Sequence, residues 1–512
     1  MQATADTVVY DESMSHSADS EQVPFLKKEL QYVIDQNGSG DYSRNEAIFE
    51  TINISNGAKW ADFRDAFLSI PTVTVISRDA QPEPDHTAGG ALPDGLRWKS
   101  GPVIIDSVMV QFGNNTVVQQ RRGVSAWCSF KQHTTQSMDD VQTKGDSWSY
   151  FRPSNAWSWS DSRGLNCAER AISHDEFTAY DANTAQVTGT TALFQANGGD
   201  SYEYDGSGTT KKHIYRKDIR IRLRDLLLFD ELPLLKGSNF KITLTFNQCE
   251  SVSDYADNAV LIGAADSLRG SMCPVIRTNP TPGTAHTELI SVKVGQNGIY
   301  KPQKSQCRLY VPSYTMSSEH ELAYMGRGVQ KVRYTDVFTN VLQNNLGGGA
   351  SFSHLVSNSL SRMKRLIMVP MLAKHATNAG GRTPQQSPYT HEPSVCSPCT
   401  IRDFNVKLSG NNVYNSPVQY KYESFLDELS GKFGVNGGRD DGITSGLINM
   451  RDYENNFGYI VVDLSRRLKY DDNTPLSLQI DGTVASPMAL DFHLFVEFER
   501  DISIDITTGA MV

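Results

Sequence analysis

Two stretches that lie far apart in this chain carry the same strand pattern, and this internal repeat constrains the fold more than any other feature. DSVMVQFGNN (Asp106 to Asn115) alternates apolar and polar residues and ends in a Gly-Asn-Asn turn, and RDFNVKLSGNN (Arg402 to Asn412) repeats the pattern. Alternation with a period of two predicts a strand with one buried face, and the turn residues predict a hairpin. We therefore expect one architectural plan to occur twice in the chain.

A second pair of motifs follows the first in the same order. IRIRLRDLL (Ile219 to Leu227) precedes FKITLTF, and YIVVDLSRRL (Tyr459 to Leu468) precedes DFHLFVEF. The spacing between the motifs is longer in the first copy, which must therefore hold about 55 additional residues. Residues 131–212, rich in Ser, Gly, Asp, Trp and Tyr, are the expected location, as a long surface excursion between strands.

The composition favours strands and turns over helices, because 39 Gly, 21 Tyr, 21 Phe and 21 Pro accompany many Asn, Ser and Thr residues. We predict an all-β fold of two tandem eight-stranded antiparallel jelly-roll sandwiches, a double jelly roll, with short helices in loops. The expected segments are an N-terminal arm over 1–45, a first jelly roll over 46–272, a linker over 273–284 and a second jelly roll over 285–512. Within the arm, residues 25–34 could form one face of a short helix.

Charge and targeting signals restrict the partners and the location. The chain has 48 Lys and Arg against 58 Asp and Glu, a net charge of −10, which repels phosphate backbones and argues against direct sequence-specific nucleic-acid binding. The opening residues lack a basic segment and an apolar core, and no later window approaches eighteen consecutive apolar residues. We therefore expect neither a signal peptide nor a transmembrane segment. Seven scattered cysteines, an odd number, are expected to be reduced thiols.

Candidate metal sites in the sequence each lack a complete set of ligands. Cys396 and Cys399 have the spacing of half a zinc site, but no second pair completes four ligands, so a structural loop is favoured. A solvated acidic loop is likewise favoured over a divalent-ion site for two further groups: His174, Asp175 and Glu176, and Asp254 with Asp257. The starting motifs of hydrolases, NTPases, zincins and dinucleotide-binding enzymes are also missing. We assign no catalytic residue, no cofactor and no metal, and we expect the protein not to be an enzyme.

Two groups of side chains have both a binding and a structural interpretation. The first is aromatic and lies in the long excursion; it could form a glycan platform, although packing of the loop on itself or on a neighbouring subunit is favoured: Trp148, Trp157, Trp159, Tyr150 and Phe151. The second is basic and could form a phosphate-binding stripe, although charges on a solvent-facing or intersubunit surface are favoured: Arg216, Lys217, Arg220, Arg222 and Arg224. The second copy does not repeat the stripe.

The second half also resembles a known family. CRLYVPSY (Cys307 to Tyr314), RLIMVPML, CSPCTIRDFNVKLSGNNVY, YKYESFLDEL, GLINMRDYENNFGYIVVDLSRRL and VEFERDISIDITTGAMV carry the resemblance. These segments resemble the double jelly-roll major capsid proteins of polinton-like viruses, adintoviruses and virophage-like elements. The resemblance covers about residues 45–510 and is specific from 300 onward, whereas 131–212 match nothing in the family.

The resemblance implies a structural function rather than a catalytic one. A homotrimer would form a pseudo-hexagonal capsomer that tiles an icosahedral shell around double-stranded DNA. It would contact neighbouring capsomers and, we expect, a penton protein and minor capsid proteins. The location would be the virion, after synthesis in the host cytoplasm; contact of the arm with an internal membrane is left open. The alternatives are a carbohydrate-binding or carbohydrate-active β-sandwich protein and a virion spike component.

Overall fold

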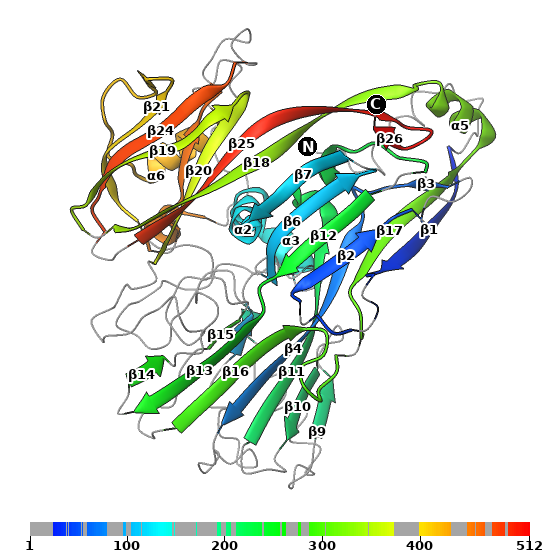
Figure 1. Cartoon of the computed structure of the whole chain (residues 1–512), viewed down its shortest axis with the longest axis horizontal. Helices are drawn as coiled ribbons and strands as arrows, with labels where there is room; N and C mark the ends of the chain where they lie inside the picture. The colour runs from blue at the N-terminus through cyan, green and yellow to red at the C-terminus, as the bar shows by residue number, and fades with distance from the viewer. Residues whose placement is uncertain are drawn as a thin grey trace.

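The computed structural model describes residues 24–78, 96–98, 104–148, 170–171, 192–195, 201–205, 211–262, 275–277, 286–372, 399–431, 448–465, 474–486 and 490–511, apart from short gaps inside these ranges. There the chain folds mainly into antiparallel strands, which are arranged as two sandwiches side by side (Figure 1). None of the helices in these ranges is long and apolar enough to cross a membrane.

The first sandwich pairs a four-stranded sheet with a larger one. The smaller sheet has the order β2-β12-β6-β7, made of β2 (Glu46–Glu50), β12 (Phe240–Phe246), β6 (Ile105–Phe112) and β7 (Asn115–Arg122). The facing sheet contains β1 (Phe25–Ile34), β17 (Arg308–Met316), β4 (Phe67–Arg78) and β11 (Lys211–Arg222), paired in that order. Val108, Val110, Ile242, Leu244 and Leu309 are fully buried between the sheets, as their alternation predicts.

Further strands widen the larger sheet. The far half of β4 pairs with β16 (His286–Val294), and the remaining members are β13 (Cys249–Ala256), β14 (Ala259–Ile262), β10 (Ser201–Asp205), β9 (Ala192–Gln195) and β3 (Trp60–Ala61). A separate small sheet has the order β15-β5-β8, made of β15 (Val275–Arg277), β5 (Leu96–Trp98) and β8 (Arg170–Ala171).

The second sandwich repeats this plan with eight strands, to which the short β26 is added. One sheet has the order β18-β25-β20-β23, made of β18 (Val329–Leu346), β25 (Leu490–Asp505), β20 (Met363–Leu372) and β23 (Ile460–Asp463), and β26 (Ala510–Met511) pairs with the end of β25. The other has the order β19-β24-β21-β22, made of β19 (Ser351–Leu360), β24 (Leu476–Val484), β21 (Ile401–Leu408) and β22 (Asn411–Asn412). Strand for strand, these two orders match β1-β17-β4-β11 and β2-β12-β6-β7 of the first sandwich.

The repeated hairpin motif lies at the same place in both copies. It joins β6 to β7 in the first sandwich and β21 to β22 in the second, each through a two-residue turn. In the second turn Ser409 and Gly410 have φ angles of 48° and 84°, the left-handed pair of a type I′ hairpin. A helix follows each hairpin: α2 (Val124–Thr135), with α3 (Met138–Lys144) behind it, and α6 (Tyr422–Leu429), with α7 (Met450–Asn455) further on. The prediction from the first motif pair is therefore confirmed.

The second motif pair is correct in its first part only. IRIRLRDLL forms the end of β11 and the 3₁₀ helices η4 (Leu223–Asp225) and η5 (Leu227–Glu231), while YIVVDLSRRL contains β23; β11 and β23 pair with the equivalent strands β4 and β20. The predicted match of FKITLTF with DFHLFVEF is wrong. FKITLTF is β12, whose counterpart by position in the sheet is β24, whereas DFHLFVEF lies in β25, the counterpart of β17. Similar alternation occurs in many strands, so alternation alone does not identify equivalent ones.

The expected arm and linker are also corrected by strand pairing. Residues 25–34 form a strand, not a helix, because β1 pairs along its length with β17 and so belongs to the first sandwich. The expected linker 273–284 contains β15, which pairs with β5, and the following β16 and β17 both pair with β4 of the first sandwich. The chain changes sandwich after β17, through α5 (Ser318–Met325), rather than at 273–284.

The expected surface excursion 131–212 begins inside a helix. Residues 131–135 complete α2, where Gln132 and His133 are buried, and α3 follows. Most of the excursion beyond residue 148 lies outside the described residues. One continuous cluster of buried apolar side chains runs through both sandwiches, so they share a core.

Candidate functional site

Helix α2 makes one of the contacts between the two sandwiches. The Phe130 ring meets the Tyr459 ring edge to face, with centroids 5.0 Å apart, and the His133 Nδ1 atom lies 3.2 Å from the Tyr459 hydroxyl. At the other end of the helix, Trp127 Nε1 donates a hydrogen bond of 2.9 Å to Glu497 Oε1 on β25. Complete burial lowers the pKa of His133 to about 3, so this imidazole is neutral at ordinary pH.

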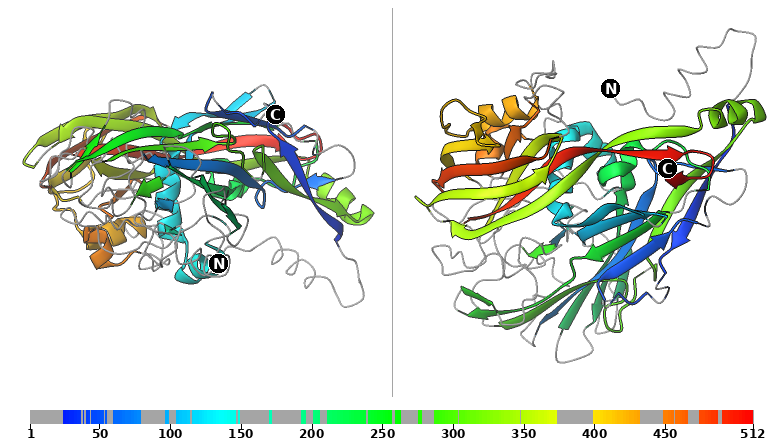
Figure 2. Two further views of the ribbon diagram at one scale, coloured as in Figure 1. Left: turned by 90° about the horizontal axis from the view of Figure 1, so that it is seen from below. Right: turned by 45° about the horizontal axis from the view of Figure 1, so that its top comes forward.

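The sheet surface beneath α2 is almost completely covered. It belongs to the two-stranded ribbon β18–β25, here called the inner ribbon, which extends from the second sandwich across the first (Figure 2). Phe495 is 1% exposed and Val337 on the neighbouring strand is also 1% exposed. Gly123, with φ of 69°, enters the helix so close to the ribbon that a Cβ atom there would lie 3.6 Å from His493 Nδ1.

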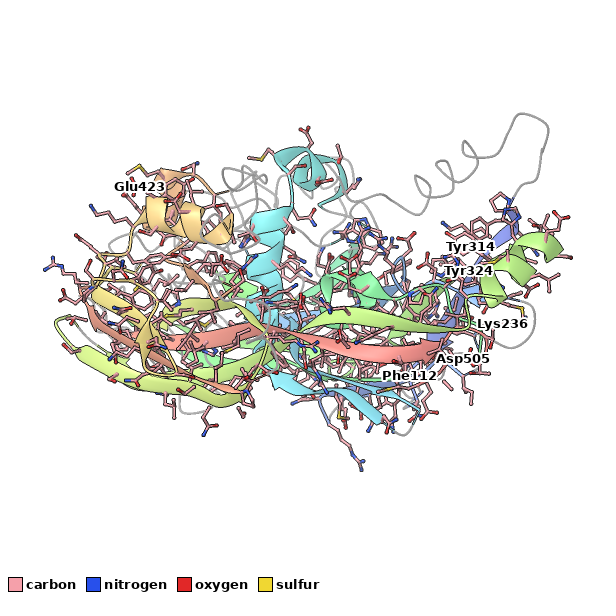
Figure 3. The ribbon with its side chains drawn as sticks, turned by 90° about the horizontal axis from the view of Figure 1, so that it is seen from above. Phe112, Lys236, Tyr314, Tyr324, Glu423 and Asp505 are labelled. Carbon is pink, nitrogen blue, oxygen red and sulfur yellow. The ribbon has the colours of Figure 1, made fainter. Side chains whose placement is uncertain are left out.

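The far end of the inner ribbon also packs against the first sandwich. The Lys236 N–H, just after η5, donates to the carbonyl of Ile506, and the Lys236 ammonium lies 2.8 Å from Glu321 Oε1 of α5. The hydroxyl of Tyr324 donates to the Leu234 carbonyl. Figure 3 shows Lys236, Tyr324 and Asp505 together at this end of the molecule. The two sandwiches are therefore held together by both backbone and side-chain contacts.

Beyond α2, a row of ion pairs continues along the same face of the inner ribbon, since Glu499 and Asp501 alternate in step with Phe495 and Glu497. Asp501 Oδ2 lies 2.7 Å from Arg362 and 3.2 Å from Lys331, and its Oδ1 lies 3.2 Å from Arg333. The hydrogen bond from Arg362, supported by the two other cations, holds the pKa of Asp501 well below its usual range. Glu499 continues the row through Lys364, 2.6 Å away. The partners of these charges lie on β18, on β20 or, for Arg362, in the turn just before β20, so the row is a structural feature of the second sandwich.

The equivalent ribbon of the first sandwich, β1–β17, has a different environment. Here called the outer ribbon, it lies at the opposite end of the molecule from α6 (Figure 1). On the side facing away from its own core, Leu30, Tyr32 and Ile34 are 57%, 54% and 40% exposed. These residues pair in register with Pro312, Tyr310 and Arg308 of β17. Four of the exposed large apolar side chains among the described residues lie on β1, since Leu26 is also exposed.

The exposed Tyr32 is the open end of an aromatic row that crosses three strands. The Tyr32 and Tyr310 rings are 5.8 Å apart, Tyr310 stacks on Phe67 of β4 at 4.8 Å, and Phe67 meets Trp148 edge to face at 5.3 Å. Trp148 and α3 cover one end of the row. Aromatic surface that remains exposed at the other end is typical of a protein contact.

Several residues singled out in the sequence have structural roles. Arg222 Nε lies 3.0 Å from Asp225 Oδ2, and its guanidinium lies over the Trp148 ring. Arg216 Nε donates to the Lys301 carbonyl, and Arg220 lies 3.9 Å from Asp218. The arginines on β11 are thus engaged within the chain and do not form a free phosphate-binding stripe. Lys217 is buried, and Arg224 is partly buried, which lowers its pKa.

The candidate metal ligands and most of the aromatic group cannot be placed. Outside the described residues lie Cys396, His174, Asp175, Glu176, Asp257, Trp157, Trp159, Tyr150 and Phe151. Asp254 lies on β13. Cys399, Cys128 and Cys307 are free thiols, and burial raises the pKa of each. Within the described ranges, no three His, Cys, Asp or Glu side chains are grouped closely enough to hold a metal ion.

The outer ribbon is the feature that sequence reasoning missed. Its signal was the alternation Lys28, Leu30, Tyr32, Ile34, which places three apolar side chains on one face of a strand. That alternation overlaps the helical spacing of Leu26, Leu30 and Ile34, and the helical interpretation was the wrong one.

Comparison with solved structures identifies the fold. A chain in the cryo-EM structure of the Sputnik virophage is similar to this one with 12% sequence identity and a TM-score of 0.53, over 97% of this chain and 90% of that chain. The fold is a double jelly roll. The prediction of an all-β double jelly roll is confirmed. The crystal structure of the mavirus major capsid protein has 13% identity and a TM-score of 0.47, covering 100% of this chain and 94% of that one.

The Faustovirus major capsid protein is a third similar structure, with 11% identity, a TM-score of 0.46 and coverage of 98% and 94% of the two chains. No protein-family model matches the sequence, and no curated protein matches it either. The similarity is thus one of fold and not of sequence, so the function must be inferred from the arrangement of the two sandwiches.

Proposed function

We propose that this chain is the major capsid protein of a virus with an icosahedral shell around double-stranded DNA, and that it acts as a homotrimer. Its role is geometric and not catalytic. The observation that carries the proposal is that two sandwiches of identical strand order lie side by side in the same sense. Across Figure 1 the sheets follow one another as β19-β24-β21-β22, β18-β25-β20-β23, β2-β12-β6-β7 and finally the sheet of β1 and β17.

When the same head-to-tail contact repeats from unit to unit, it produces a closed ring if the rotation between neighbouring units is a whole fraction of a full turn. Contacts of this kind are heterologous, because each unit uses one face to bind and another to be bound. One chain supplies two similar wedges, so three chains supply six, and the outline approaches a hexagon. Such units tile a flat surface without gaps. The double jelly-roll fold, which is shared with a chain of the Sputnik virophage, supports this proposal.

The test is the mass and outline of the purified protein. We expect a species of three times the 56.7 kDa chain mass by light scattering, and hexagonal outlines in negative-stain images. A chain that stays monomeric at the high micromolar concentrations typical of viral assembly would overturn the proposal. In isolated particles, this protein should dominate the protein mass.

We further propose that the capsomers contact one another, a penton protein and minor capsid proteins within the virion. Mass spectrometry of chemically cross-linked particles tests these partners one by one. Cross-links that join this chain only to itself would reject the penton and minor-protein contacts while leaving the capsomer intact. The role of the N-terminal segment is tested by removing residues 1–23 only, because a deletion up to residue 44 would also remove β1.

A further inference from the structure

The two ribbons of the molecule are equivalent in position but differ in what covers them. The inner ribbon β18–β25 and the outer ribbon β1–β17 each consist of the first and last strands of their sandwich, and each pairs through its last strand with the equivalent strands β20 and β4. The core side is also equivalent, since Leu494 and Val496 of β25 and Leu309 and Val311 of β17 are fully buried. The two ribbons differ on the opposite side, which faces away from the core of their own sandwich.

On the inner ribbon, the part of this opposite side from His493 to Glu497 is covered by a helix of the other sandwich, and the ion pairs of Glu499 and Asp501 lie beyond it. His493, Phe495 and Glu497 point to it, and α2 lies on them, with Trp127 bonded to Glu497. Phe495 is 1% exposed and His493 is 8% exposed. The helix that covers the inner ribbon is the one that follows the hairpin β6–β7.

On the outer ribbon the same side is equally apolar and is open. Leu30 and Tyr32 are more than half exposed, and Tyr310 lies between Tyr32 and Phe67 in the aromatic row. An exposed apolar surface on an edge strand attracts other chains unless something covers it. By the internal repeat, the covering element should be the helix that follows the second hairpin, which is α6.

The α6 of the same chain is too far away to cover the outer ribbon. Figure 3 shows Glu423 of α6 at one end of the molecule and Tyr314 of β17 at the other. Both α2 and α6 project to the same side of the sheets in that view, as a repeated contact requires. Only a second copy of the chain can therefore place α6 on the outer ribbon.

The two surfaces are complementary in charge. The open side of the outer ribbon has Lys28, over the Tyr314 ring, and Arg308, whose guanidinium lies over the Tyr32 ring, whereas Lys27 at the tip is paired with Glu29. The α6 side of the second sandwich carries exposed Glu423 and, on α7, exposed Glu454. Opposite charges around an apolar centre favour one orientation of docking over others.

The α6 side also supplies apolar surface for such a contact. Met450 at the start of α7 is 51% exposed, and Tyr453, one helical turn later, stacks on Phe425 of α6. A flexible methionine packs well against aromatic rings. Together with the exposed acids, it gives this surface the apolar centre and polar margin of a protein contact.

We propose that the outer ribbon of one copy binds the α6–α7 side of the second sandwich of the next copy. This contact would be the intermolecular counterpart of the α2 contact within the chain, and it would close the ring of three. This inference rests on the proposed function, since it assumes that the chain forms a trimer. Leu30 and Tyr32 are its apolar centre on one side, and Glu423 and Met450 lie on the other.

The first test is a set of substitutions read as trimer dissociation. We expect Tyr32→Glu and Leu30→Glu, and on the other surface Met450→Glu, to raise the dissociation constant of the trimer at least about tenfold. Ile299→Glu is the matched control, because Ile299 is 77% exposed on a turn between β16 and β17, outside both surfaces. Circular dichroism and thermal unfolding verify that each variant is folded.

The second test needs no destabilising change. A photoreactive benzoylphenylalanine replaces Tyr32, and the variant is mixed with a ¹⁵N-labelled copy before irradiation. We expect the cross-linked peptide to contain residues from 422–429 or 450–455 of the other isotopic form. Cross-links to another surface, or within one chain, would overturn the inference.

The outcomes separate this inference from the proposed function. A wild-type protein that never forms trimers contradicts the capsid proposal itself. A wild-type trimer whose dissociation is unaffected by Tyr32→Glu and Leu30→Glu, and whose cross-links fall elsewhere, leaves the capsid proposal standing and rejects this contact.

Discussion

The inner and outer ribbons are built to the same plan, yet one is part of the core and the other is open. The difference is what lies on them: α2 of the first sandwich covers Phe495 and His493, while Leu30 and Tyr32 are more than half exposed. A folded chain normally buries large apolar side chains where it can. Because the chain contains two sandwiches, it has two such ribbon surfaces, and only the surface of the inner ribbon is covered within the chain. The second surface stays exposed in the single chain, and the proposed contact between copies would cover it.

The comparison is tested most strongly by removing one ring from each ribbon. We expect Phe495→Ala to lower the free energy of unfolding by about 3–5 kcal/mol, because it leaves a cavity between β25 and α2. Tyr32→Ala should lower the stability of the dissociated chain by only about 1 kcal/mol, from the lost ring pair with Tyr310 and the contact with Arg308. Urea unfolding measures both free energies, at a protein concentration too low for trimers to form. Equal losses for the two variants would contradict the difference between the ribbons.

The two hairpins were predictable from sequence, whereas the ribbons were not. A hairpin depends on neighbouring residues and on turn chemistry, so Gly113 and Gly410 indicated both turns correctly. The outer ribbon depends on the pairing of Phe25–Ile34 with Arg308–Met316, which no local pattern reveals. The spacing of Leu26, Leu30 and Ile34 fitted a helix equally well. The strand forms instead of the helix because β1 pairs with β17, which is beside it in space but far away along the chain.

The candidate surface was hidden from the sequence for a related reason. A residue is exposed or covered according to elements far away in the chain, and nothing near Tyr32 distinguishes it from a core tyrosine. The reverse error occurred at residues 131–135, which were expected on the surface and instead complete α2. Polar composition predicted a loop there, but His133 and Gln132 are buried at the contact between the sandwiches.

The contact between α2 and the second sandwich should weaken in mild acid because of His133. Its folded-state pKa is about 3, whereas an exposed histidine titrates near 6.5, so only the unfolded chain binds a proton between these values. The stability contributed by the neutral imidazole is complete above pH 6.5 and is lost as the pH falls. We expect a loss of about 2 kcal/mol between pH 6.5 and pH 5.

The control for this prediction is His133→Phe, which keeps a ring against Phe457 but cannot be protonated. Its stability should vary less with pH over the same interval, even if its value at pH 7 is lower after loss of the contact with the Tyr459 hydroxyl. Denaturant midpoints at pH 7, 6 and 5 give the comparison. Parallel pH profiles of the variant and the wild type would show that another group is responsible.

A smaller effect is expected at the hydrogen bond that joins α2 to the inner ribbon. Trp127→Phe keeps most of the ring but removes the donor to Glu497, which is then left partly buried with fewer partners. We expect the free energy of unfolding to fall by about 1–2 kcal/mol. In the background Glu497→Gln, where the acceptor is uncharged, the same change should cost less, and a double-mutant cycle measures the coupling.

The smallest effect is expected further along the same face of the inner ribbon, beyond α2, where charges rather than apolar groups lie. Asp501→Asn removes the acid shared by Arg362, Lys331 and Arg333 and should lower stability at neutral pH by less than about 1 kcal/mol. Because the folded-state pKa of Asp501 is lowered, its contribution is present above the ordinary aspartate pKa and is lost as the pH falls towards the folded value. Salt should reduce it further, since water reaches the three cations. If Asp501→Asn instead cost as much as Phe495→Ala, charge and not burial under α2 would hold the inner ribbon in place, and the absence of a covering helix would no longer explain why the outer ribbon is open.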